Sequence, residues 1–193
     1  MKKYIIEDNF FKNPRLIRMK GLFKKYYNKF NHPDKTAIND FPGVRTVDIS
    51  LFDEKLYNFC FTKINNIIQD EGIGKLNPDV MQSRFHYSLT FSDTPYCWHY
   101  DVDPQDPFNN AVGRKGNHFA TNLEYAGIIY LNDKVDTTYG TKILWNDEVL
   151  EIENIFNRLV IYPTTTFHTL NGTFGNNRYD SRMVITIFFN VVQ

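Results

Sequence analysis

One short stretch of the chain, His99-Tyr100-Asp101, carries two side chains of the kind that bind metal ions. Side chains two positions apart on an extended chain point the same way, so the His99 imidazole and the Asp101 carboxylate can take adjacent positions around one ion. Alone the tripeptide is weak, because a solvated histidine before a turn-starting aspartate is common. His168, far beyond Asp101 in a strand-like run, offers a second imidazole, although a histidine bonded to backbone in the core would look the same.

Two imidazoles and one carboxylate on one side of a metal leave three positions open, which is the ligand set of non-haem Fe(II) oxygenases. A keto acid bound to such an iron keeps a distal carboxylate. Burying that charge in an apolar barrel is costly unless a guanidinium meets it with paired hydrogen bonds. Arg178 and Arg182 follow His168 just before the final strand-like run, and either could supply the guanidinium. His32 and His86 lack such partners and are interpreted as surface or structural residues.

Short strands would have to position these side chains. In 81–91 the odd positions are mostly apolar and the even positions polar, which indicates a strand with one buried face. Further segments are rich in β-branched and aromatic residues and are separated by turn residues. These segments are 125–131, 141–145, 158–162, 165–170 and 182–191. The series predicts a β-sandwich or barrel.

Two helices are expected ahead of the strands. Apolar residues at helical spacing, beginning with Leu16, Met19 and Phe23, predict an amphipathic helix over 12–30 whose lysines and arginines form the solvated face. A second helix is expected to begin at Ser50 as its N-cap and to end at Glu71-Gly72. We expect one domain over 1–193, with 1–78 as a helical support and 79–193 as the strand core.

Composition limits the function. The 193 residues are 42% hydrophobic and 16% aromatic, enough for one compact core. Seven basic residues without an acid in 12–29 suggest a polyanion site, but a solvated helix face is the preferred interpretation, so nucleic-acid binding is not expected. No long apolar run or secretory signal occurs, and Cys60 and Cys97 are expected to be buried free thiols. We therefore expect a cytoplasmic protein with no membrane segment.

One long connection, 102–123, shows no period and contains Arg114, Lys115 and His118. Long irregular connections in compact domains tend to be lids or binding loops. We expect the substrate to meet this segment, with His118 solvated rather than in contact.

The sequence resembles the 2-oxoglutarate and Fe(II)-dependent oxygenases, most closely their prolyl-hydroxylase-like branch and its small bacterial and phage members. The similar segments occur in order along the second half of the chain. They are 96–101, 127–132, 140–141, 158–163, His168 and 182–189. The resemblance implies a mostly β (α+β) fold, with a double-stranded β-helix, or jelly-roll, core and N-terminal helices packed on one side.

The resemblance also implies roles for particular residues. His99, Asp101 and His168 would bind Fe(II). Arg182 directly precedes a hydrophobic run, as the 2-oxoglutarate arginine of this branch does, and so ranks ahead of Arg178. Tyr130 would bond the same distal carboxylate. Some relatives have a serine two residues beyond the arginine, where this chain has Val184, and Thr186 on the same strand face could assist.

The implied function is an Fe(II)- and 2-oxoglutarate-dependent dioxygenase. It would use O2 to hydroxylate a substrate C–H bond and would release succinate and CO2. Hydroxylation is expected because related halogenases lack the carboxylate that Asp101 supplies. Two alternatives remain open, namely a cupin-like metal-binding jelly roll of other activity and a non-catalytic structural or binding module. The sequence does not indicate whether the substrate is a protein side chain, a peptide or a small molecule, nor the oligomeric state.

Overall fold

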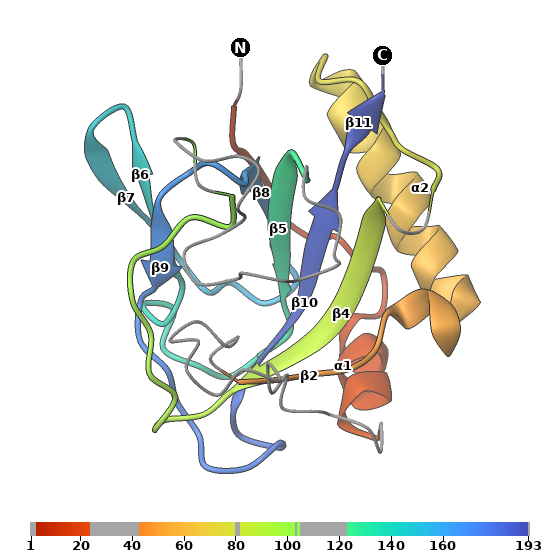
Figure 1. The fold of residues 1–193 in the computed structure, drawn as a ribbon. Coiled ribbons are helices and arrows are strands. Elements are labelled where there is room, and N and C mark those ends of the chain that lie inside the picture. The colour runs from red at the N-terminus through yellow and green to blue at the C-terminus, as the bar shows by residue number, and fades with distance from the viewer. Residues whose placement is uncertain (1–2, 24–42, 80–81, 103, 105–122, 193) are drawn as a thin grey trace, which may run out of the picture.

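The computed structural model describes residues 3–23, 43–79, 82–102, 104 and 123–192, and most of its regular elements are β-strands (Figure 1). A short 3-10 helix spans Ile49–Leu51. In chain order the other elements are β1 (Ile5–Glu7), α1 (Pro14–Leu22), β2 (Val44–Arg45), α2 (Glu54–Asp70), β3 (Lys75–Leu76), β4 (Ser83–Thr90), β5 (Tyr125–Tyr130), β6 (Thr141–Trp145), β7 (Glu148–Ile152), β8 (Leu159–Pro163), β9 (His168–Leu170), β10 (Arg182–Phe189) and β11 (Val191–Val192).

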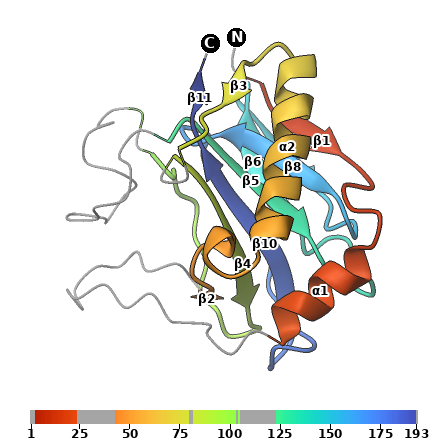
Figure 2. The same ribbon diagram turned by 90° about the vertical axis from the view of Figure 1, so that its right-hand side faces the viewer.

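Two antiparallel sheets form the core. The larger has the order β1-β8-β5-β10-β4-β2 and the smaller the order β7-β6-β9, while β11 and β3 form a separate pair. The smaller sheet lies on one side of the larger sheet, and α1 and α2 lie on the other (Figures 1 and 2). Chain neighbours such as β4 and β5 are separated in the sheet by β10, so strands from distant parts of the chain are interleaved. The predicted jelly-roll core with helices on one side is confirmed.

The larger sheet has two different faces because successive side chains of a strand point to opposite sides. On β10 the residues Met183, Ile185, Ile187 and Phe189 pack in one apolar cluster with the buried residues of α2. Val184 faces the other way and packs in a second cluster, which includes residues of the smaller sheet. We call these the helix-facing side and the inner side of the larger sheet.

The first helix is confirmed only within 14–22, because 24–42 lies outside the described residues. Its predicted apolar face was wrong there, since Leu16 and Met19 are half exposed and the fully buried residue is Gly21. A Cβ at Gly21 would stand 2.7 Å from the ring of Tyr87, so glycine is needed for this close approach. Ile17 packs beside it against the core. The helix contacts the sheet through a small residue, and hydrophobic spacing does not reveal such a contact.

The second helix starts three residues later than expected. The Asp53 side chain accepts a hydrogen bond from the Leu56 backbone N–H and caps α2. Ser50 belongs to the preceding 3-10 turn, which Asp48 caps. The predicted end at Glu71-Gly72 is confirmed, with Glu71 as the C-cap and Gly72 at φ +67°.

The predicted strands are all present with shifts of a few residues, but the prediction that 81–91 has one buried face was wrong. Every residue of β4 other than His86 is buried. The hairpin strand β7 was also missed. It pairs with β6 through a two-residue turn, Asn146-Asp147, in which both residues have positive φ. The first 78 residues supply β1 and β2 at the two edges of the larger sheet as well as the helices.

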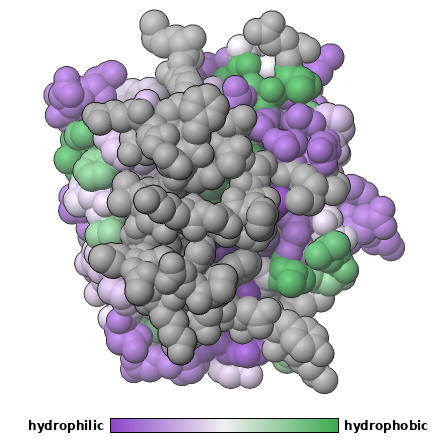
Figure 3. All heavy atoms as spheres, in the orientation of Figure 1, coloured by the Kyte–Doolittle hydropathy of each residue, from purple (hydrophilic) through white to green (hydrophobic). Residues whose placement is uncertain are grey.

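Within the described residues, neither helix has the length and hydropathy needed to cross a bilayer. The described surface in Figure 3 is largely hydrophilic, and its hydrophobic residues form small separate areas. Most of the long connection predicted between 102 and 123, with Arg114, Lys115 and His118, lies outside the described residues, as does His32. Cys60 is buried as expected, whereas Cys97 is exposed, which corrects the prediction for that thiol.

Candidate metal centre

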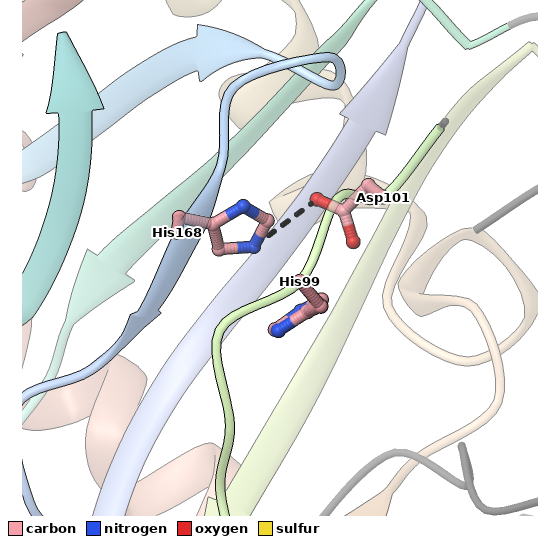
Figure 4. A group of neighbouring side chains, drawn as sticks. All are labelled: His99, Asp101 and His168. Atoms are coloured by element: carbon pink, nitrogen blue, oxygen red, sulfur yellow. Dashed lines mark ion pairs between the residues drawn. The ribbon is translucent and has the colours of Figure 1, made fainter. Parts of the chain in front are cut away.

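Backbone pairing brings the two predicted histidines together. His99 and His168 form an antiparallel bridge in which each backbone N–H donates to the other carbonyl at 2.9 Å. Two residues further on, the backbone N–H of Asp101 donates to the Thr164 carbonyl at 3.1 Å. The segment containing His99 and Asp101 is thus held beside β9 although the two lie far apart in the sequence. All three side chains point toward a common centre (Figure 4).

The spacing of the three side chains suits one ion. A ligand atom from each of His99, Asp101 and His168 lies within 4.8 Å of the others. Nε2 of His168 is 3.5 Å from Oδ2 of Asp101. Two ligand atoms at right angles and about 2.1 Å from one ion would be about 3 Å apart, so a small movement of side chains closes the site. Two imidazoles and one carboxylate are also the ligand set that Fe(II) takes in a facial arrangement.

Both imidazoles are oriented by the same local contact. Nδ1 of His99 is 2.9 Å from the carbonyl oxygen of Cys97, and Nδ1 of His168 is 2.8 Å from that of Thr166. A carbonyl can only accept, so each Nδ1 carries the proton and each Nε2 keeps a lone pair. This backbone contact behind the ligand nitrogen is the usual support of a metal-binding histidine. The residues present therefore fit a metal ion.

Burial favours the neutral form of His168. It lowers the pKa of His168, while the Asp101 carboxylate acts in the opposite direction and His99 lowers the pKa further. The ring of Tyr162 lies 4.8 Å from the ring of His168, centroid to centroid. Burial and then Asp101 raise the pKa of Tyr162 well above its usual value, so its hydroxyl stays protonated.

A buried cation lies on the same inner side of the larger sheet. Arg182 is 2% exposed, and its Nε and Nη2 have no hydrogen-bond partner among the described residues. Its guanidinium carbon is 5.4 Å from the ring centroid of Tyr130, whose hydroxyl donates to Oγ1 of Thr141 at 2.8 Å. Burial lowers the pKa of Arg182, and the adjacent tyrosines oppose this effect. Unpaired buried charge is costly, so an anion is expected here.

Arg178, the alternative arginine, lies elsewhere. It donates from Nη1 to the carbonyl of Leu22 at the end of α1, at 3.2 Å. Arg182 and Tyr130 thus lie together in the interior, and Arg178 lies beside a helix. The assignment of Arg182 and Tyr130 as the residues that bind 2-oxoglutarate stays a prediction. Thr186 is bonded to Ser88 through their hydroxyls at 2.9 Å.

Two residues near the site were not singled out from the sequence, although both lie in segments that carry the resemblance. Tyr162 packs against His168, and Thr141 accepts a hydrogen bond from the hydroxyl of Tyr130. Gly140-Thr141 was noted only as part of the resemblance. A Cβ at Gly140 would stand 1.8 Å from the backbone oxygen of Ile152, so only glycine fits between β6 and β7 at that point.

No family model matches the chain, and no curated protein does. Solved structures match over nearly all of it. A prolyl-4-hydroxylase from Pseudomonas putida has a TM-score of 0.68 at 14% identity, covering 100% of this chain and 95% of the hydroxylase. A prolyl hydroxylase from Trichoplax adhaerens in complex with a peptide of hypoxia inducible factor has a TM-score of 0.68 at 13% identity, and the match covers 98% of this chain and 84% of the hydroxylase. HygX from Streptomyces hygroscopicus with nickel and 2-oxoglutarate bound has a TM-score of 0.61 at 7% identity, and the match covers 99% of this chain and 84% of HygX.

These neighbours are prolyl-4-hydroxylases and other 2-oxoglutarate-dependent oxygenases, and the chain has their fold. At identities of 7–14% the likeness concerns the fold. The roles of the site residues therefore rest on this chain's own geometry.

Proposed function

We propose that this protein is an Fe(II)- and 2-oxoglutarate-dependent dioxygenase that hydroxylates a substrate C–H bond and releases succinate and CO2. The observation that carries the proposal is the buried guanidinium of Arg182, two of whose nitrogens lack a partner among the described residues, together with the three-ligand cluster. A cupin-like site would need the metal ligands but not an internal cation of this kind. A dicarboxylate that binds the metal at one end and Arg182 at the other accounts for both.

The chain's own residues would divide the work. His99, Asp101 and His168 would hold Fe(II), and the imidazoles are already oriented through their Nδ1 contacts. Arg182 would pair with the distal carboxylate of 2-oxoglutarate through two parallel hydrogen bonds. Tyr130 lies beneath the guanidinium, and its hydroxyl would turn its one proton from Thr141 to the same carboxylate, with the Thr141 hydroxyl then donating to it. When bound, iron and 2-oxoglutarate together supply the oxidising chemistry with O2, and the protein supplies orientation and a site that excludes water.

Ligand binding without turnover tests the proposal first. Thermal unfolding is measured anaerobically with Fe(II), then with added 2-oxoglutarate. A ligand at 100 times its Kd stabilises the folded state by about 2.7 kcal/mol. Each ligand should raise the melting temperature, and 2-oxoglutarate should add a metal-to-ligand charge-transfer absorption. His99→Ala should lose the metal response, and succinate release should fall to background.

Arg178→Gln is the matched control for Arg182→Gln. Both remove one positive charge in the same segment, and only the Arg182 variant should lose the response to 2-oxoglutarate. The opposite result would move the assignment to Arg178. A wild-type protein that binds Fe(II) tightly and ignores 2-oxoglutarate would be a metal-binding jelly roll of another activity. Normal succinate release by His99→Ala would contradict the proposal outright.

The substrate belongs to the proposal only as a class. It is a protein side chain, a peptide or a small molecule with a C–H bond that can be brought near the metal. One structural neighbour was solved with a peptide bound. A reducing, cytoplasmic setting is also part of the proposal, since it would keep the exposed Cys97 free.

A further inference from the structure

A second arginine points to the inner side of the larger sheet, from its edge strand β2. Arg45 pairs with Ser88 of β4, Ser88 with Val184 of β10, and Val184 with Tyr130 of β5. Paired residues share a face, so these four side chains form one row on the inner side. With strands about 4.8 Å apart, Arg45 and Tyr130 begin about 14 Å from each other. Val44 points the opposite way and packs on the helix-facing cluster.

The Arg45 side chain runs from this row toward the metal cluster. Its Nε donates to Oγ of Ser88 at 3.2 Å, and its guanidinium carbon lies 5.4 Å from the ring centroid of Phe188. Phe188 pairs with Ala126, and Ala126 pairs with Tyr162, the residue that packs on His168. The head of Arg45 and the metal ligand His168 thus flank the same row of the sheet.

Arg182 lies at the other end of β10. It precedes Phe188 by six positions, which is about 20 Å along a strand. The described interior therefore has a guanidinium toward each end of β10. A 2-oxoglutarate molecule between the metal and Arg182 would leave the Arg45 end for the molecule that is oxidised.

The other ionisable groups of this wall do not duplicate Arg45. Burial lowers the pKa of Arg84, and the charges of Asp48 and Asp79 oppose this effect. His86 is neutral near pH 7, because burial and then Arg45 lower its pKa to about 4. The guanidinium carbon of Arg45, 5.4 Å from the Phe188 ring, lies on the side of this wall that carries Tyr162 and His168.

We propose that Arg45 binds an anionic group, a carboxylate or a phosphate, of the primary substrate and so determines which molecule is oxidised. A guanidinium matches either group with two parallel hydrogen bonds. Ser88 orients the guanidinium through Nε, and the Phe188 ring supports its face. Ser88 is itself held by the hydroxyl of Thr186. This inference rests on the proposed function, because it assigns the substrate side of the same site.

Two simple anions serve as probes. The protein is loaded with Mn(II) and saturating 2-oxoglutarate, then titrated with inorganic phosphate or with carboxyl-labelled acetate. Bound near Mn(II), each anion shows paramagnetic broadening of its phosphorus or carbon NMR signal. We expect saturable broadening by at least one anion, and the more strongly bound anion indicates a phosphate or a carboxylate on the substrate.

The variants separate charge from structure. Arg45→Gln should weaken anion binding by tenfold or more, and Arg45→Lys should retain part of it. Ser88→Ala keeps the arginine but removes the acceptor of its Nε, and should weaken binding about two- to fivefold. Arg15→Gln is the control, since Arg15 is exposed and pairs with Asp133 elsewhere. It should bind the anion as the wild type does.

The inference is overturned if Arg45→Gln binds the anion as the wild type does, or if neither anion shows saturable broadening in the wild type. If Arg45→Gln does not fold, unchanged binding by both Arg45→Lys and Ser88→Ala overturns it. Binding of Mn(II) and 2-oxoglutarate is measured first in the same samples. If the wild type does not bind 2-oxoglutarate, the proposed function is refuted. If the wild type binds 2-oxoglutarate but neither anion, only the role of Arg45 is refuted.

Discussion

The two sides of the larger sheet differ in the polar groups that they bury. On the helix-facing side, β10 contributes Met183, Ile185, Ile187 and Phe189, all completely buried among apolar neighbours. On the inner side the same strand contributes the buried Arg182 and Thr186. Burying apolar groups stabilises the fold, while burying an unpaired cation costs free energy. The inner side also has an apolar cluster around Val184, so the difference is that only this side combines apolar packing with buried polar and charged groups that a ligand could use.

Truncation on the helix-facing side should have the largest effect on stability. Ile185→Ala removes a fully buried side chain from the middle of β10 and leaves a cavity, so we expect the free energy of unfolding to fall by about 2–5 kcal/mol. Chemical denaturation measures this. At 25 °C the folded fraction should still bind 2-oxoglutarate with an affinity within threefold of the wild type. A loss of 2-oxoglutarate binding larger than the loss of stability would break the division between the two sides.

On the inner side, pH should act through His86. The pKa of His86 is about 4 in the folded state, from burial first and Arg45 second, against an ordinary value of 6.5. Between these two pH values the unfolded chain binds the proton and the folded chain does not. The contribution of His86 to the free energy of unfolding is therefore fully present above pH 6.5 and is lost as the pH falls to 4. The loss for this residue is about 3 kcal/mol.

The measurement compares wild type and His86→Gln by denaturation at pH 7 and pH 4. Both lose stability through other groups, but the wild type should lose about 3 kcal/mol more. Equal losses would show that His86 can be protonated in the folded protein without cost. The inner wall would then be better hydrated than its burial indicates.

Replacement of the internal cation should separate stability from binding. Arg182→Met keeps a long apolar stem and removes the buried guanidinium, so the unliganded protein should be as stable as the wild type or more stable. Affinity for 2-oxoglutarate should fall about 10- to 100-fold, the value of a charge-assisted hydrogen bond. Calorimetry with Mn(II) present measures the affinity. A clearly destabilised Arg182→Met with normal 2-oxoglutarate binding would assign the arginine to the fold.

The sequence predicted the helix-facing side better than the inner side, and β4 explains why. Its odd residues Phe85, Tyr87 and Leu89 are apolar and were correctly expected in the core. Its even residues are polar, and a polar residue looks the same whether it faces bulk water or a ligand cavity. Ser88 and Thr90 were therefore expected in solvent, yet they are almost completely buried.

Pairing between distant segments is the second feature that limited prediction from the sequence. The clustering of His99 with His168 depends on a bridge between segments that are distant in the sequence, which no local pattern specifies. It was expected from ligand types, strand order and resemblance. Arg45 lies in a segment, 41–45, that shares the resemblance to the bacterial and phage proteins, but the sequence assigned it no role, because its place on the inner side follows from the register of β2 against β4.

The smallest expected effect compares the same substitution on the two sides. Tyr130→Phe on the inner side removes the hydroxyl that donates to Thr141 beside Arg182, while Tyr57→Phe on the helix-facing side removes the hydroxyl that donates to the Ser83 carbonyl at 3.0 Å. Each lost hydrogen bond is worth about 1 kcal/mol. In Tyr57→Phe the loss should appear only as lower stability. In Tyr130→Phe the loss of stability should be accompanied by roughly fivefold weaker 2-oxoglutarate binding. If both variants lose only stability, Tyr130 is a structural residue and the carboxylate depends on Arg182 alone.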